Sequence, residues 1–307
     1  MFRRKREQQP KGSYETVEKS ISEVFEKAKK SSDFTTIAVT ENNDTLLISF
    51  YKTMIDSNIF QKSILPLLKE KASAIKGLSN LKNFIPIEDI QITNDPSKVE
   101  KAFHDGAIVI YRKEKDGEYA LLHIGDHRLG QREINDTQNE FSVIGPKVGF
   151  IEDISTNLHL LREHLNTADL IFEEYIVGSR MKTKVVLSYL DGVTNPEYVN
   201  TIKQRLEELD IDITYDTTHL EQLITDHSLT PFPLYITTER VDRTVGALVQ
   251  GQVVLINDKS SYALIYVVGR FKTSYPTVSP DSSLTIGWKY VSNELLSIIF
   301  FNSINCL

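Results

Sequence analysis

The residues of this chain that could do chemistry are most concentrated in the segment TTERVDR, which holds two arginines and two acids. An exposed guanidinium can bind a carboxylate through two parallel hydrogen bonds, so Arg240 and Arg243 could grip an anionic ligand or a partner protein. The same segment could instead be a capped helix start. In that case Thr238 is the cap, Glu239 lies in the first turn, and Asp242 joins local ion pairs. The sequence leaves both interpretations open.

The other titratable groups do not form a recognisable catalytic or metal-binding set. His123 and His127 are four residues apart in a strand-to-turn region, where this spacing does not place both side chains on one face. His159 and His164 diverge on a predicted helix, so we interpret the histidines as surface or cap residues. No Walker loop, GxGxxG, GxSxG, HExxH or CxxC occurs in the chain. We therefore predict no catalytic residue, no metal site and no cofactor, and so no enzyme.

The composition is that of an ordinary water-soluble globular protein. Hydrophobic residues make up 40% and charged residues 25%, and the formal net charge of −7 gives nucleic-acid binding little electrostatic support. The one cysteine, Cys306, cannot form an intrachain disulfide. No stretch approaches the ~18 to 20 apolar residues that span a bilayer. The basic cluster at residues 3–6 is expected to be solvated, or to contact anionic lipid weakly.

The two halves of the chain show the same order of strand-like segments. LLISFY at 46–51 matches VVLSYL at 185–190, and GAIVIY…EYALLHIG at 106–125 matches GQVVLIN…SYALIYVVG at 251–269. With the helical segments between them, these runs predict an α/β fold of two mixed-sheet α/β subdomains of similar topology joined by a helix. Chance convergence of two β-hairpins would give a similar pattern. The strand orders of the two halves distinguish the alternatives.

Apolar spacing and capping residues place several helices. The first is predicted over residues 14–30, Asp56 can cap the helix after the first strands, and Asn195 precedes a proline at a helix start. The helix at the join, residues 152–165, carries apolar residues at alternating spacings of three and four, which predicts a single buried seam. Arg162 falls mainly outside this seam, so we expect it on an outer face.

Two blocks of sequence carry a specific resemblance. The first reads GPKVGFIEDISTNLHLLR from Gly145 to Arg162 and continues with VGSRMKTKV, and the second reads TPFPLYITTERVDRTVGALVQG over 230–251. At this spacing the identities resemble the A subunit of spore germinant receptors, the GerA family of endospore-forming bacteria. The resemblance extends from about residue 33 to about residue 265. Val241 departs from it, because the family has proline there, and Val249 and Gln250 depart from it near the end of the second block.

The resemblance implies a component of a nutrient germinant receptor complex that acts in spore germination. Such an A subunit joins B and C subunits in the spore inner membrane, and a second copy of the chain is an additional candidate partner. The resembling part is the soluble region of the subunit, expected to sense or transmit a signal without catalysis. This chain alone is expected to be soluble. The alternative is a soluble module that binds an amino acid or a sugar and has no membrane role.

We expect four segments along the chain: an N-terminal basic segment and helix over 1–32, a first subdomain over 33–143, a second over 144–268, and a divergent tail over 269–307. The tail shows no family pattern, which favours a truncated or frameshifted C-terminus.

The residue types and the resemblance together define a candidate interface or ligand patch. In it, Arg180 and Lys184 could meet an anionic surface, or could protect a strand edge by their charge. The full patch comprises Glu152, Asp153, Thr156, Asn157, Arg162, Arg180, Lys184, Thr238, Glu239, Arg240, Asp242 and Arg243.

Overall fold

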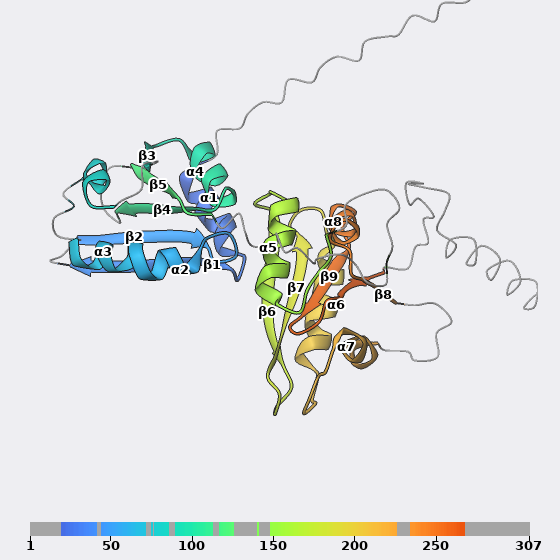
Figure 1. The fold of residues 1–307 in the computed structure, drawn as a ribbon. Coiled ribbons are helices and arrows are strands. Elements are labelled where there is room, and N and C mark those ends of the chain that lie inside the picture. The colour runs from blue at the N-terminus through green and yellow to red at the C-terminus, as the bar shows by residue number, and fades with distance from the viewer. Residues whose placement is uncertain are drawn as a thin grey trace, which may run out of the picture. The chain divides into compact units, whose positions relative to one another are not determined.

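The computed structural model describes residues 20–41, 44–71, 75, 77–85, 90–112, 117–125, 140, 148–225 and 234–267. This part of the chain forms two five-stranded sheets, each with helices packed on both faces (Figure 1). The basic cluster at residues 3–6 and the tail over 269–307 lie outside the described residues. None of the described helices is long and apolar enough to cross a membrane.

The first sheet has the strand order β1-β2-β4-β5-β3, and each neighbouring pair is antiparallel. Its strands are β1 (Phe34–Glu41), β2 (Asp44–Tyr51), β3 (Ile90–Thr93), β4 (Ala107–Arg112) and β5 (Tyr119–His123). Helices α1 (Ile21–Lys29) and α4 (Pro96–His104) bury their apolar residues on one face. The other face is covered by the π-helical segment η1 (Phe60–Ile64), α3 (Leu65–Lys71) and the 3-10 helix η3 (Leu78–Asn83). The short α2 (Ser57–Ile59) leads into η1 and has no buried residue.

The second sheet has the order β6-β7-β9-β10-β8, again antiparallel at each pairing. Its strands are β6 (Leu170–Val177), β7 (Thr183–Leu190), β8 (Tyr235–Thr238), β9 (Val253–Asn257) and β10 (Ala263–Tyr266). Helices α5 (Ile154–His164) and α8 (Val241–Val249) cover one face. Helices α6 (Pro196–Glu207) and α7 (Thr217–Ile224) cover the other. Each subdomain is therefore a three-layer α/β unit.

The two subdomains repeat one topology. If five is subtracted from each strand number of the second sheet, its order becomes that of the first. Gly106 and Gly251, which precede β4 and β9, both have positive φ, of 73° and 80°. A Cβ on either glycine would meet a carbonyl oxygen in the turn that follows the second strand, at 2.6 Å from Met54 and 3.0 Å from Val193. The prediction of two α/β subdomains of similar topology is confirmed, and we infer an internal duplication.

The sheets differ in one respect from the expectation. The described pairings are all antiparallel, where the sequence led us to expect mixed sheets. The helical crossover after the second strand carries the chain to the far edge, where β3 and β8 pair antiparallel with β5 and β10. As a result, no two neighbouring strands in the described sheets run parallel.

Helix boundaries follow the capping residues closely. Asp56 accepts hydrogen bonds from the backbone N–H groups of Asn58 and Ile59 at 2.8 and 2.9 Å, and Asn195 caps α6 ahead of Pro196, as predicted. The first helix begins at Ile21 within the described residues, so residues 14–19 of its predicted range lie outside them.

Candidate functional site

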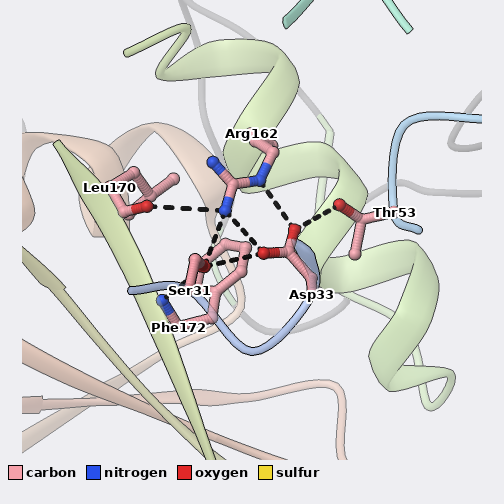
Figure 2. Close-up of polar contacts among 6 residues, drawn as sticks. All are labelled: Ser31, Asp33, Thr53, Arg162, Leu170 and Phe172. Carbon is pink, nitrogen blue, oxygen red and sulfur yellow. Dashed lines mark hydrogen bonds and ion pairs between the residues drawn. The ribbon is translucent and has the colours of Figure 1, made fainter. Parts of the chain in front are cut away.

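The most deeply buried charged group of the described residues is Arg162, and it lies between the two subdomains. Arg162 stands on α5 of the second subdomain, and its side chain is fully buried. Its Nε donates to Asp33 Oδ2 and its Nη2 donates to Asp33 Oδ1, both at 2.8 Å (Figure 2). Asp33 belongs to the turn between α1 and β1 of the first subdomain. The pair therefore joins the two repeats directly.

Each oxygen of the Asp33 carboxylate has a further donor. The hydroxyls of Ser31 and Thr53 each donate to it at 2.7 Å. Arg162 Nη2 also donates to Ser31 Oγ at 2.9 Å and, at 3.4 Å, to the carbonyl of Leu170 at the start of β6 (Figure 2). Hydrogen bonds of this kind offset the cost of moving two charges out of water.

Two aromatic rings lie close to the guanidinium. The Arg162 Cζ lies 3.9 Å from the centroid of the Tyr51 ring and 4.7 Å from that of Phe172. His104 stacks on Tyr51, with ring centroids 5.6 Å apart. Cation–π contacts are strongest when water is excluded, as it is here.

These surroundings shift the proton affinities of three groups. Burial alone would raise the pKa of Asp33, but the Arg162 charge and the hydrogen bonds from Arg162, Ser31 and Thr53 hold it below its usual value. Burial raises the pKa of Tyr51 to about 12. Burial, helped by the positive charge of Arg162, lowers the pKa of His104 to about 4. The site thus holds one charged pair beside a neutral tyrosine and a neutral histidine.

The site corrects two expectations drawn from the sequence. Arg162 was expected on an outer face of its helix, but α5 is covered twice: by α8 and β9 of its own subdomain, and by residues 31–53 of the other. The histidines were interpreted as surface or cap residues, yet His104 is 6% exposed and His159 is 5% exposed, and the Nδ1 of His159 lies 2.8 Å from the carbonyl of Thr53. A single apolar seam cannot reveal a second covering surface.

The residues at the start of α5 have structural partners. Asp153 caps the helix, accepting from the Thr156 backbone N–H at 2.9 Å and from its hydroxyl at 2.6 Å. The Asn157 amide, fully buried, bonds both backbone groups of Ile151, at 2.8 and 2.6 Å. The Glu152 side chain is exposed, and its carbonyl accepts from the Lys259 backbone N–H at 2.9 Å. These residues fix the entry of the chain into α5.

Thr238 is not the cap residue of the helix in the segment TTERVDR, which was one of the two interpretations that the sequence left open. Thr238 is the last residue of β8, opposite Ala263, and α8 begins at Val241, with Arg240 in the cap position. The strand pairing extends through Thr238 and so delays the helix. Glu239 is buried between the two elements, and its carbonyl accepts from the backbone N–H of Phe150 at 2.8 Å.

The charged side chains of this segment pair locally. Arg240 donates to both oxygens of Asp242, at 2.9 and 2.6 Å. Burial opposes ionisation of Asp242, but the bonds from Arg240 hold its pKa below the usual value. Glu140, which was not among the predicted patch residues, accepts from the Thr238 hydroxyl at 3.0 Å and lies 3.2 Å from Arg243 Nη1. The Arg243 side chain is still 52% exposed.

Arg180 and Lys184 lie apart from the junction, on the β6–β7 hairpin. The Arg180 side chain is 78% exposed and lies 3.4 Å from Asp212, and Lys184 pairs with Glu174 at 3.1 Å. The structure therefore separates the predicted patch into three places: the junction with the start of α5, the Thr238–Arg243 segment, and the hairpin. Asp33, Ser31 and Thr53 were missed, although the serine and aspartate have a counterpart in Thr167 and Asp169, which likewise precede a first strand.

Comparison with solved structures reveals the same fold. The chain is similar to the crystal structure of the N-terminal domain of the A subunit of the Bacillus megaterium spore germinant receptor GerK3. The TM-score is 0.57 at 24% identity, covering 82% of this chain and 95% of that one.

Curated sequences point the same way. The chain is 36% identical over 283 residues to spore germination protein GerIA of Bacillus cereus, and 33% identical over 246 residues to GerQA of the same species. These matches cover 91% and 80% of this chain but only 41% and 48% of the relatives, so the chain spans less than half of their length. The model of the family described as Bacillus/Clostridium GerA spore germination protein matches residues 19–273. The chain belongs to the GerA family of spore germination proteins.

Proposed function

We propose that this chain acts in spore germination as a non-catalytic component of a nutrient germinant receptor complex, where it senses or transmits the germination signal. The observation that carries the proposal is the family match over residues 19–273, which spans both α/β subdomains. The fold shared with the N-terminal domain of a receptor A subunit supports it. By this proposal the partners are B and C subunits at the spore inner membrane, and a second copy of the chain is a further candidate.

The contacts at the junction support a role in transmission rather than in chemistry. Asp33 and Arg162 bond to each other across the junction, and their other bonds go to the Ser31 and Thr53 hydroxyls and to the Leu170 carbonyl, so most of their polar atoms already have partners. A signal received by one subdomain could then pass to the other through a fixed mechanical link. We propose the Thr238–Arg243 segment, whose Arg243 stays half exposed, as the surface that meets a partner subunit.

The experiment is deletion of the gene in the spore-forming organism that carries it. Purified spores are exposed to a panel of amino acids and sugars, and germination is followed as loss of absorbance. We expect the deletion to slow the response to at least one nutrient and the intact gene to restore it. A matched complementation with Arg162→Ala, checked for protein level, tests whether the junction matters.

Unchanged germination across the panel would contradict the proposal. Calorimetry on the purified chain tests the alternative, in which the chain is a soluble binding module. Saturable heat with an amino acid or sugar, together with unchanged germination of the deletion strain, would favour that alternative.

A further inference from the structure

Two ion pairs, here called the limbs of the junction, connect the subdomains. In one limb the second subdomain supplies the basic residue and the first the aspartate, and in the other limb these roles are exchanged. Arg162 stands two residues before the end of α5, and Lys27 stands two residues before the end of α1. Each reaches the aspartate that directly precedes the first strand of the other subdomain. Arg162 binds Asp33 ahead of β1, and Lys27 pairs with Asp169 ahead of β6.

The two aspartates sit in equivalent turns. Ser31 Oγ donates to the Asp33 carboxylate at 2.7 Å, and Thr167 Oγ1 donates to that of Asp169 at 3.1 Å. In both turns the aspartate carbonyl accepts from the residue that directly follows the second strand, at 2.9 and 2.8 Å. The reciprocal pairing is therefore a consequence of the internal repeat.

The two limbs differ strongly in burial. The side chains of Arg162 and Asp33 are 0% and 5% exposed, whereas those of Lys27 and Asp169 are 33% and 41% exposed. The buried limb also includes a backbone bond of 2.8 Å from Ser32 N–H to the Phe172 carbonyl. Buried pairs are screened little by salt, but exposed pairs contribute little and lose most of that as salt rises.

A second partly exposed pair supports the Lys27 limb. Lys30, directly after α1, bonds Asp191 at 2.6 Å, and the two side chains are 56% and 38% exposed. Both exposed pairs connect the end of α1 to the second subdomain. They form one set that dissolved ions can reach, beside the enclosed Arg162 site: Lys30 directly precedes Ser31, and Asp169 directly precedes Leu170.

We propose that the junction is a hinge with one fixed limb and one releasable limb. Arg162 and Asp33 are the pivot that holds the subdomains together. Lys27–Asp169 and Lys30–Asp191 are a latch that salt loosens, so that the subdomains separate on the latch side while the pivot stays closed. This property goes beyond the proposed function, because it belongs to the chain itself and is measured without receptor partners.

The test measures the distance between the subdomains by pulsed electron paramagnetic resonance. Nitroxide labels are placed on the full chain at the exposed positions Lys98→Cys on α4 and Asn200→Cys on α6, with Cys306→Ser removing the native thiol. We expect Lys27→Ala/Lys30→Ala to raise the population of a second distance roughly two- to fivefold, the ratio that an exposed ion pair supports. Salt at about 1 M, where the screening length is ~3 Å, should produce the same change in the labelled parent, which keeps both lysines. It should produce little further change in the double variant.

Lys29→Ala is the matched control, because this lysine of α1 pairs with Glu26 of the same helix at 2.8 Å. We expect it to leave the distances unchanged. The latch is overturned if the double variant behaves as Lys29→Ala does, or if salt alters the double variant as much as the parent. The pivot is overturned if folded Arg162→Lys, which keeps the charge but loses the paired donors, leaves the distances and the unfolding midpoint unchanged.

Discussion

The guanidinium of Arg162 and the carboxylate of Asp33, 129 residues apart in the chain, form two 2.8 Å hydrogen bonds in a place where the side chains are 0% and 5% exposed. The two repeats thus share one enclosed ion pair. Removing one member leaves the other charged, buried and unpaired, which costs much more than the net value of the intact pair. This asymmetry makes the junction sensitive to substitution of either residue.

Replacing Arg162 by alanine should lower the free energy of unfolding by about 3–5 kcal/mol, because Asp33 loses its counter-charge and two donors. Urea unfolding followed by circular dichroism measures the change. The control is Arg180→Ala, whose side chain is 78% exposed and which should change stability by ~0.5 kcal/mol or less. Equal effects of the two variants would contradict the enclosed pair.

Replacing Asp33 by asparagine should remove a pH-dependent part of the stability. The folded pKa of Asp33 is depressed, so its contribution is fully present above the unfolded pKa of ~3.9 and is lost as the pH falls through the folded value. The stability advantage of the parent over Asp33→Asn should therefore be constant above about pH 5 and shrink under more acidic conditions. Urea midpoints measured down to about pH 3 check the direction. An advantage that grows in acid would show that the carboxyl is protonated in the fold.

His104 should destabilise the protein in mild acid. Its folded pKa is about 4, against ~6.5 in the unfolded chain, so between these values the unfolded chain binds the extra proton. Stability is unaffected above about pH 6.5 and falls as the pH drops towards 4, by up to about 3 kcal/mol. His104→Phe should remove this part of the loss, while Arg180→Ala, which leaves His104 in place, should retain it. Identical slopes in the parent and His104→Phe would refute the assignment.

The repeat could be predicted from the sequence because its strands have a recognisable pattern of apolar residues. LLISFY and VVLSYL became β2 and β7, and the capping of α2 and α6 followed from Asp56 and Asn195. These features are local, since a strand pattern or a cap needs only its neighbours along the chain. The resemblance to the A subunits could also be found in the sequence, because it rests on residues at fixed spacing along the chain.

The junction could not be predicted, because it depends on contacts across more than a hundred residues. The pattern of α5 shows one apolar seam and gives no sign that a second surface covers Arg162. Thr238 illustrates a related failure: its type and position favoured a helix cap, but pairing with Ala263 on a distant strand held it in β8. The repeated Ser31-x-Asp33 and Thr167-x-Asp169 turns are the signal that could have directed attention to the junction, once the halves were aligned.

Replacing Arg243 by alanine should weaken association with the proposed partner subunits without unfolding the chain. Its side chain is 52% exposed and pairs with Glu140 at 3.2 Å, so the loss of stability should be ~1 kcal/mol or less. A guanidinium that remains half exposed can still form a two-bond contact with a carboxylate of a partner. Recovery of B and C subunits with the tagged chain from detergent-solubilised spore membranes measures the effect. Lys101→Ala, an exposed charge on α4 of the first subdomain, is the control and should leave recovery unchanged. Equal recovery with Arg243→Ala and Lys101→Ala would remove the Thr238–Arg243 segment from the list of partner surfaces, and would leave its arginines with the local pairing that the structure shows.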